Sequence, residues 1–281
     1  MKSHQRIIRE NLFEADIKAL PFNHSTLKAS NFTLSNEPMS KEIVNFIKTY
    51  EWLGTIGPSP KWIFTARYNG LLGGVVLVNE PNSYSKIMGA DTRKYEALIQ
   101  RGACASWTPK NLGSRLIMSA CKWMVSNTTK RMFVAYADPA ANEIGTLYQA
   151  CNFEYLGSGF GVKHMLAHPS IGKGKPFSSQ TLRRTSTLKK WAKEQGIVIE
   201  PSWIKPNGFK DLSKIPDIVK KAWYQWGSNI QKESKKIQVN PKGKYILVLG
   251  KDRKEQAYLN SLKKYQSKPY PKRKVSDADH D

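Results

Sequence analysis

Apolar residues between positions 40 and 160 recur first at helical spacing and then at strand spacing. KEIVNFIKTYEW follows Ser40, a favoured N-cap residue, and gathers its apolar residues on one helical face. Asn69-Gly70 separates two β-rich runs and predicts a tight hairpin. The other predicted elements, in chain order, are a short helix near Arg6–Ile17, strands at Trp62–Tyr68, Leu71–Val78, Ala97–Ser106 and Arg131–Asp138, a helix from Asn111, a short helix in PAANEIGTLYQACN capped by Asn142 or Ala141, and a strand beginning at FEYLGSG. This alternation is typical of one α/β mixed sheet flanked by helices.

The pattern changes after about Pro169. IGKGKPFSSQ is rich in Gly, Pro and Ser, and SSQTLRRTSTLKKWAKEQG and SKIPDIVKKAWYQWG predict two helices, the first of them basic and amphipathic. GKYILVLG predicts a strand and DRKEQAYLNSLKKY a third helix. We therefore predict two domains: residues 1–169 as the catalytic sheet domain, and residues 170–281 as a basic, mainly helical extension with one strand that binds nucleic acid.

Composition is that of a folded protein without membrane spans. A hydrophobic fraction of 40% supports a packed core, and no apolar run approaches the roughly 20 residues that cross a bilayer. The N-terminal stretch MKSHQRIIRENLF lacks the apolar segment of a signal peptide. The three cysteines, Cys104, Cys121 and Cys151, have no paired spacing, so we expect reduced thiols in a cytoplasm rather than a disulfide framework or a zinc site.

Positive charge is large and unevenly spread. The chain has 45 Lys and Arg against 22 Asp and Glu, a formal net charge of +23, and residues 170–281 hold 26 of those bases against 10 acids. Such a field attracts polyanions and releases their counterions on binding. The charge therefore favours a nucleic acid as the partner of this protein. The alternative is a soluble protein whose positive charge serves no binding function.

The stretch RGACASWTPKNLGSRLIMSACKWM passes from a predicted strand through a tight turn into a helix. Gly113 permits the turn, Ser114 offers a hydroxyl, and the first N–H groups of a helix have no intrahelical partner. Such a turn suits a pyrophosphate or a developing oxyanion. An ordinary capped helix is the plain alternative.

Three further polar residues converge on the same edge of the predicted sheet. Asp138 follows a strand, Tyr148 lies on the next short helix, and Arg101 lies in the neighbouring strand. Ligands of open α/β sheets bind where strands end. Asp138 is placed to orient or deprotonate an amine and Tyr148 to donate a proton. Taken singly, the three are also explained by an Asp-Pro turn, a half-buried tyrosine and a surface arginine.

Two motifs carry a resemblance to a known family. The order of elements looks like the GNAT-type acyltransferase fold, and RGACASWTPKNLGSRLI followed by YADPAANEIGTLYQACNFEYLG resembles the Mom DNA-modification proteins of Mu-like phages. The resemblance covers roughly residues 40–170. It implies an enzyme of the host bacterial cytoplasm that converts adenine in DNA to N6-carbamoylmethyladenine, which protects phage DNA from restriction.

The resemblance also implies site residues. By motif position the catalytic residues are Arg101, Ser114, Asp138 and Tyr148. Ser114 and its turn then bind the acyl carbonyl or the donor, and Arg101 neutralises a phosphate or carbonyl. The donor-binding residues of the turn are Trp107, Lys110, Gly113, Ser114 and Arg115.

The donor and the metal stay open at this stage. TPKNLGS keeps one glycine of the GNAT acyl-CoA loop, so the donor is either acetyl-CoA or an aminoacyl-tRNA. A glycyl ester is consistent with the product: it acylates N6, and its amine then attacks C6 and displaces the amide nitrogen, leaving N6–CH₂–CO–NH₂. The family resemblance implies ferrous iron, but the sequence has no obvious His/carboxylate facial triad near the motif residues, and the metal is left unknown.

Reaching N6 inside double-stranded DNA requires extrusion of the adenine from the base stack. This favours aromatic side chains that stack on it and Lys or Arg side chains that bind phosphates. Tyr50 and Trp107 are candidates for stacking. The predicted nucleic-acid contacts are Tyr50, Arg183, Arg184, Lys189, Lys190, Lys220 and Lys221. With an aminoacyl-tRNA donor, tRNA becomes a second partner.

Two rival functions remain. One is an N-acetyltransferase that uses acetyl-CoA on a protein or small amine. The other is a nucleic-acid-binding protein without catalysis, whose binding depends steeply on salt but not on Ser114 or Tyr148.

Overall fold

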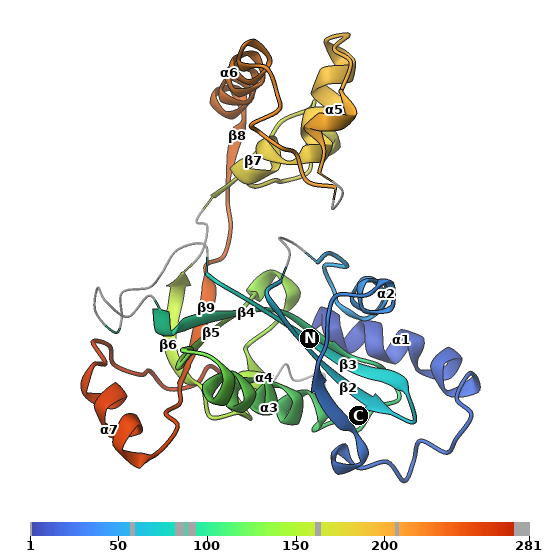
Figure 1. The fold of residues 1–281 in the computed structure, drawn as a ribbon, viewed down its shortest axis with the longest axis vertical. Helices are drawn as coiled ribbons and strands as arrows, with labels where there is room; N and C mark the ends of the chain where they lie inside the picture. Colours follow the sequence, from blue (N-terminus) through green and yellow to red (C-terminus); the bar gives the residue numbers. More distant parts are fainter. Residues whose placement is uncertain are drawn as a thin grey trace. The chain divides into compact units, whose positions relative to one another are not determined.

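Two compact units make up the protein (Figure 1). The computed structural model describes residues 2–56, 60–81, 88, 94–160, 164–205 and 208–272. The first unit joins Met1–Phe160 to Pro241–Asp281, and the second is Gly161–Asn240. The sequence prediction instead put one boundary between residues 169 and 170. The chain returns to the first unit because the apolar strand GKYILVLG pairs with the central sheet.

The sequence pattern predicts a mixed sheet, and one forms the centre of the first unit. It has seven strands, of which β1 was not predicted and β9 was assigned to the extension. The spatial order is β1-β2-β3-β4-β5-β9-β6, and only β4 and β5 pair in parallel. The strands are β1 Thr33–Asn36, β2 Trp62–Tyr68, β3 Leu71–Asn79, β4 Glu96–Cys104, β5 Met132–Ala137, β6 Glu154–Phe160 and β9 Lys242–Val248.

Local signals in the sequence determine the first half of this sheet. Asn69 and Gly70 adopt positive φ angles of 47° and 80°, as a two-residue hairpin turn requires, so the predicted hairpin is confirmed. Ser40 caps α2 (Lys41–Tyr50), and its side chain accepts a hydrogen bond from the Ile43 N–H at 3.2 Å.

Helices cover the sheet and exclude water from its core. In Figure 1, α1 (His4–Lys18) lies behind the β2–β3 hairpin, and α2 packs against β3 and β4. The predicted helix after Asn111 is α3, Leu112–Asn127, and it packs against β1 to β4. Near the C-terminus, α7 (Arg253–Ser261) packs on β9. Among the described residues, no helix combines the length and the apolar character that crossing a bilayer requires.

The segment between β5 and β6 departs from the prediction. Asn142, expected as a possible helix cap, ends a short 3₁₀ turn (Pro139–Ala141) with a φ of 54°, and α4 (Thr146–Gln149) starts after Gly145, which has a φ of 74°. A Cβ atom on Gly145 would lie 2.3 Å from the ring of Tyr245, so only glycine fits there. The positive φ angles fold residues 138–145 back over the end of the sheet.

The second unit is small and helical around a tryptophan core. Its helices are α5 (Thr185–Glu194) and α6 (Asp217–Glu233), which confirms the two predicted helices, and α6 runs beyond the predicted stretch. A two-stranded sheet of β7 (His164–Ala167) and β8 (Lys235–Gln238) completes it. Its buried core residues include Leu188, Trp191, Trp203, Ile215 and Trp223.

Candidate active site

A gap opens between the two parallel strands of the sheet. β4 and β5 pair only through Glu96–Leu98 and Met132–Val134, and both strands continue beyond that ladder. A cavity of about 600 Å³ lies there, within the size range of small-molecule sites. Residues of α1, β4, β5 and α4, of the segments after α2 and between β5 and α4, and at the start of β9 line it. The ionisable ones are Arg6, Glu51, Arg101, Tyr136, Asp138, Glu143, Tyr148 and Lys242.

Arg101 is fixed at the wall of this cavity. Its Nε donates to the Thr55 carbonyl at 3.2 Å, and one Nη donates to the Gln100 carbonyl at 2.9 Å. The Glu51 carboxyl lies 3.9 Å from Nε, and only 5% of its side chain is exposed. Burial raises the pKa of Glu51, while Arg101 lowers it. The guanidinium is therefore held in place with its charge facing an interior site.

Asp138 lies at the end of β5 with two partners. Its carboxylate accepts a hydrogen bond from the Ala140 N–H at 3.0 Å and forms an ion pair with Lys242 Nζ at 2.7 Å. Lys242 begins β9, 104 positions further along the chain. The ion pair therefore joins the 3₁₀ turn after β5 to the strand that comes back from the second unit.

Glu143 is the carboxyl group whose ionisation the site changes most. Burial, helped by the neighbouring charges of Asp138 and Glu51, raises the pKa of Glu143 to about 7, against a hydrogen bond from the Asp138 N–H and the charge of Lys242. That N–H lies 3.4 Å from the carboxyl oxygen. A carboxyl with such a pKa both accepts and releases a proton near neutral pH, as a general base must.

Tyr148 supplies a phenol to the same cavity from α4. Burial raises the pKa of Tyr148 above its usual value, and the charge of Glu143 adds to the effect. Its ring packs 5.5 Å from those of Phe153 and Tyr245. The phenol stays protonated at neutral pH and is a hydrogen-bond donor beside a carboxyl group.

Ser114, the fourth predicted catalytic residue, is not among the residues that line this cavity. Its hydroxyl donates to the Asn111 carbonyl at 3.0 Å, one turn back along α3. The structure thus brings Arg101, Asp138 and Tyr148 together and places the Ser114 side chain elsewhere. A serine near the start of a helix often makes this local bond.

The turn predicted to bind the donor is held mainly by structural contacts. The Trp107 ring is buried and stacks on Phe32 at 5.7 Å, so it packs the core instead of offering a face to a nucleobase. Arg115 donates to the carbonyls of Ala29 and Phe32. Lys110 is exposed, and a Cβ on Gly113 would lie 3.2 Å from Leu147. Donor binding by this turn remains a prediction.

Tyr50 and α1 brace the same turn from the other side. The Tyr50 hydroxyl and the Ser106 hydroxyl both donate to Asp16, at 2.9 and 2.5 Å. Arg9 donates to the carbonyl oxygens of Ser106 and Thr108, at 3.2 and 2.9 Å. Tyr50 therefore has a structural role in this fold, and a stacking role for it remains a prediction.

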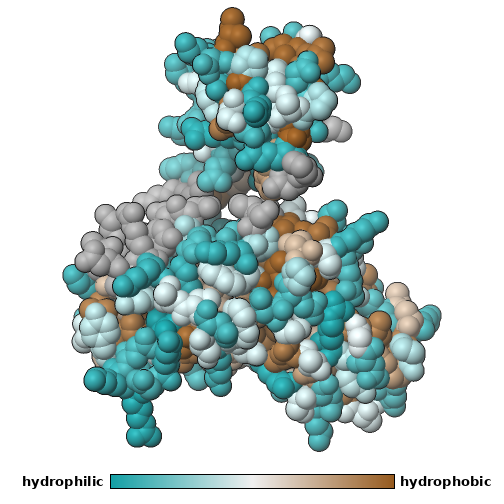
Figure 2. Space-filling view, viewed as in Figure 1, coloured by the Kyte–Doolittle hydropathy of each residue, from teal (hydrophilic) through white to brown (hydrophobic). Residues whose placement is uncertain are grey.

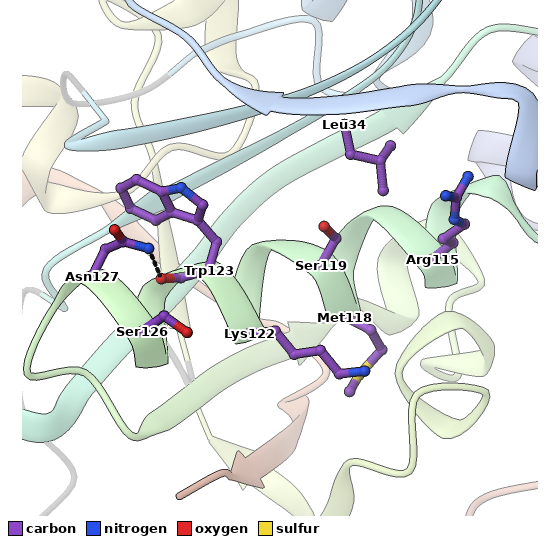
Figure 3. Close-up of a pocket in the computed structure, with 8 residues that line it drawn as sticks. All are labelled: Leu34, Arg115, Met118, Ser119, Lys122, Trp123, Ser126 and Asn127. Carbon is purple, nitrogen blue, oxygen red and sulfur yellow. Dashed lines mark hydrogen bonds between the residues drawn. The ribbon is translucent and has the colours of Figure 1, made fainter. Parts of the chain in front are cut away.

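A separate groove of about 470 Å³ runs along α3 (Figure 3). Figure 3 shows Leu34 facing the helix across it, with Arg115, Lys122 and Trp123 projecting from the helix. Two of its lining side chains are basic and none is acidic. It lacks the acid–base pair of the β4–β5 cavity, and we assign no chemistry to it.

The predicted nucleic-acid residues other than Tyr50 all lie in the second unit. Arg183, Arg184, Lys189, Lys190 and Lys221 are exposed, whereas Lys220 is half-buried and pairs with Asp217 at 2.7 Å. Residues 161–240 hold 16 Lys and Arg against 5 Asp and Glu. Figure 2 shows apolar side chains among the polar surface of this unit, and Ile218 on α6 is 79% exposed.

Sequence reasoning missed Glu51, Glu143 and Lys242. Glu143 sits inside the quoted motif, two residues before Gly145, but a glutamate in a loop carries no signal of burial. Glu51 ends a helix that the pattern already explained. Lys242 was assigned to the extension, so nothing local pointed to its pairing with Asp138.

The described residues do not fit an iron site. No three His, Cys, Asp or Glu side chains among them come close enough to hold a metal ion. Glu51, Asp138 and Glu143 line one cavity without forming such a cluster. We therefore derive no step through iron.

An antiparallel β1–β4 meander, a parallel β4–β5 pair that separates, and a helix α3 directly after β4 define a GNAT-type acyltransferase fold. The model of the Mom protein family matches residues 63–206, just over half of the 281 residues. The chain belongs to the Mom protein family. Membership and fold together support a role in DNA modification or acyl transfer.

Several solved acetyltransferases are similar at low identity. One from Bacillus subtilis in complex with CoA is 10% identical, with a TM-score of 0.36, over 78% of this chain and 99% of that one. Spermidine/spermine N-acetyltransferase SpeG from Vibrio cholerae is 12% identical, with a TM-score of 0.37, over 83% and 98%. An N-acetyltransferase from Staphylococcus aureus is 20% identical, with a TM-score of 0.32, over 46% and 90%. No protein with a curated description matches the chain.

Proposed function

We propose that this protein acylates the N6 amine of adenine in DNA and yields N6-carbamoylmethyladenine. The observation that carries the proposal is the β4–β5 cavity of a Mom-family chain, where Arg101, Glu143 and Tyr148 meet. Acyl transfer to a weakly nucleophilic amine needs a base, a proton donor and a positive group near the developing oxyanion. These three side chains supply one of each.

The proposed acylation uses each group once. The N6 nitrogen attacks the acyl carbonyl, Glu143 takes a proton from that nitrogen, and Arg101 faces the oxygen on which negative charge develops. As the tetrahedral intermediate collapses, the bond to the donor oxygen or sulfur breaks and Tyr148 donates a proton to that atom. Asp138 and Lys242 position the segment that carries Glu143, and their charges shift its pKa in opposite directions.

A glycyl ester accounts for the product without a further reagent. The N6–CO bond forms and the donor alcohol leaves. The glycyl amine then attacks C6, the bond from C6 to the original N6 breaks, and that nitrogen becomes the carboxamide. Labelled glycine should enter the modified base, and complete RNase digestion should stop it if the ester is an aminoacyl-tRNA. An unchanged yield after digestion would remove the tRNA donor.

The second unit is proposed to hold the DNA. Its exposed Lys and Arg side chains neutralise phosphates, and each neutralised phosphate adds to the salt dependence of binding. Extrusion of the adenine costs a few kcal/mol, which the backbone contacts must offset.

Charge reversal in the second unit should weaken DNA binding. Replacing Arg183, Arg184 and Lys189 by glutamate is expected to lower affinity at least about tenfold and to flatten the plot of log affinity against log salt by up to roughly 3. Fluorescence anisotropy with duplex DNA at several salt concentrations measures both effects. The matched control is Lys251→Glu, Arg253→Glu and Lys254→Glu on and beside α7, which changes net charge equally. Equal losses in the two triple variants would refute a localised contact.

The proposed product is testable directly. Plasmid DNA from cells that express the protein should contain a modified adenine heavier than adenine by the carbamoylmethyl group, measured by nucleoside mass spectrometry. The Glu143→Gln variant is the matched control. Unmodified plasmid together with acetyl-CoA binding by calorimetry would instead favour the N-acetyltransferase.

A further inference from the structure

A second cavity adjoins the active site along one short segment. It has a volume of about 360 Å³, and Glu143 and Ile144 line it as well as the β4–β5 cavity. Its other lining residues come from the end of β5, from β6, from β9 and from the C-terminal segment after α7. No residue of this cavity other than Glu143 has a role in the chemistry proposed above. An enzyme that joins two substrates needs two binding sites that meet at one reacting group, and Glu143 is placed between two cavities.

The walls of this second cavity are flat and rigid. The half-buried Tyr155 supplies an aromatic ring, with the buried Tyr245 packed against it, and Pro139 and Pro271 supply apolar rims. Tyr245 is fully buried, and its hydroxyl donates to the Ile144 carbonyl and lies 3.2 Å from the Gln149 amide nitrogen. The Tyr155 ring packs against it with a centroid distance of 5.0 Å. These contacts fix the two rings before any ligand arrives.

The C-terminal segment lines one side of the cavity and is held by contacts to β6 and to Phe153 directly before it. The Lys268 N–H donates to the Tyr155 carbonyl at 2.6 Å, and the Tyr270 hydroxyl donates to the Phe153 carbonyl at 2.8 Å. These bonds bring Pro271 and Lys272 to the cavity, 122 and 123 positions after Gln149, the last residue of α4. The cavity is therefore lined by segments of the first unit that these hydrogen bonds hold together.

The polar groups of the cavity are few and mixed. Glu143 offers a carboxyl oxygen, Lys272 an ammonium group and Ser158 a hydroxyl. A purine presents two apolar faces, ring nitrogens that accept hydrogen bonds and, in adenine, an amine that donates them. Aromatic and proline walls suit the faces, the lysine and serine suit the ring nitrogens, and the carboxyl suits the amine.

We propose that this second cavity binds the extruded adenine, while the β4–β5 cavity binds the acyl donor. The inference rests on the proposed function, and it adds the location of the base. The adenine amine then points at Glu143 from one cavity, and the acyl carbonyl lies near Arg101 and Tyr148 in the other. The proton that leaves N6 goes to the side chain that both cavities share.

Filling the second cavity tests this arrangement. Ser158 is exposed on β6, where a large side chain is compatible with the strand, so Ser158→Trp should fold and obstruct the cavity. The expected result is at least a hundredfold loss of modified adenine per plasmid, with duplex affinity within about twofold of wild type. The matched control is Ser126→Trp, which puts the same bulk into the α3 groove of Figure 3 and should leave modification unchanged. Undiminished modification by Ser158→Trp would overturn the proposal.

Disulfide trapping locates the base without relying on activity. The probe is duplex DNA with an adenine that carries a thiol tether on C2, a ring position that faces away from Glu143 when N6 points at it. Ser158→Cys should form a mixed disulfide with this probe at least tenfold faster than Thr146→Cys, which lies in the β4–β5 cavity, or Ser126→Cys. Faster trapping by Thr146→Cys would place the adenine in the other cavity and reject the inference. If wild type makes no modified adenine at all, the proposed function fails, whichever cysteine is trapped.

Discussion

Replacing Glu143 by glutamine is expected to lower the rate of adenine modification by about a hundredfold to ten-thousandfold, the usual contribution of a general base. Glutamine keeps the size of the side chain and cannot take a proton. In the wild type, the carboxylate form predominates above the pKa of about 7, so the rate should rise between pH 6 and pH 8. The variant should lose this rise. Nucleoside mass spectrometry of timed reactions at several pH values measures it.

Stability should move in the opposite direction to activity. Burial raises the pKa of Glu143 in the folded state to about 7, above the usual value of 4.5, so the folded state binds more protons than the unfolded state between these two pH values. The free energy of unfolding therefore falls as the pH rises from 4.5 to about 7, because Glu143 must ionise while buried. At pH 8 the free energy of unfolding of the Glu143→Gln variant should equal that of wild type or exceed it by up to roughly 3 kcal/mol. Glu14→Gln, at an exposed position on α1, is the control for both measurements. A destabilised, inactive Glu143→Gln protein would indicate a structural role.

Replacing Asp138 by alanine is expected to lower modification at least about a hundredfold while duplex affinity stays within about twofold of wild type. The variant loses the cap on the Ala140 N–H and the 2.7 Å ion pair with Lys242, and both hold the segment that carries Glu143. It also removes a negative charge that raises the pKa of Glu143. Any residual activity should therefore reach its plateau at a lower pH than in the wild type.

The Lys242→Met variant should shift the pH dependence of activity in the opposite direction to Asp138→Ala. Because Lys242 lowers the pKa of Glu143, its loss should move the rise in activity to a higher pH. In the double variant the loss of modification should be smaller than the sum of the two single losses in free energy, since both substitutions disrupt the same ion pair. Glu42→Ala is the matched control, because it breaks a 2.7 Å ion pair with Arg67 outside the cavity. Shifts in the same direction for Asp138→Ala and Lys242→Met would contradict an electrostatic effect on Glu143.

Much of the sheet was predictable because its signals are local. The Asn69-Gly70 turn, the Ser40 cap and the apolar stripe of α3 each depend on residues within a few positions of one another. The cap of α4 was assigned wrongly to Asn142 or Ala141. Gly145 occupies that position because the buried ring of Tyr245, a hundred positions away, leaves no space for a side chain.

The candidate site was predictable in part. Arg101, Asp138 and Tyr148 follow from the rule that ligands bind where strands end, and they do line one cavity. Ser114 was predicted from the family motif; its hydroxyl donates to the Asn111 carbonyl, and a catalytic role for it stays a prediction. The ionisation of Glu143 depends on burial and on charges at Glu51 and Lys242, and no spacing in the chain records those distances.

By itself, the sequence determined the order of helices and strands, the excess of positive charge and the family to which the motifs belong. These properties depend on composition and on residues close together in the chain. Only the tertiary structure decided that strand β9 returns to the sheet, that Lys242 pairs with Asp138, and that Glu143 lies buried between two cavities. The physical reason is that pairing between distant strands and the removal of water from a side chain are properties of the whole packed unit, not of any short segment.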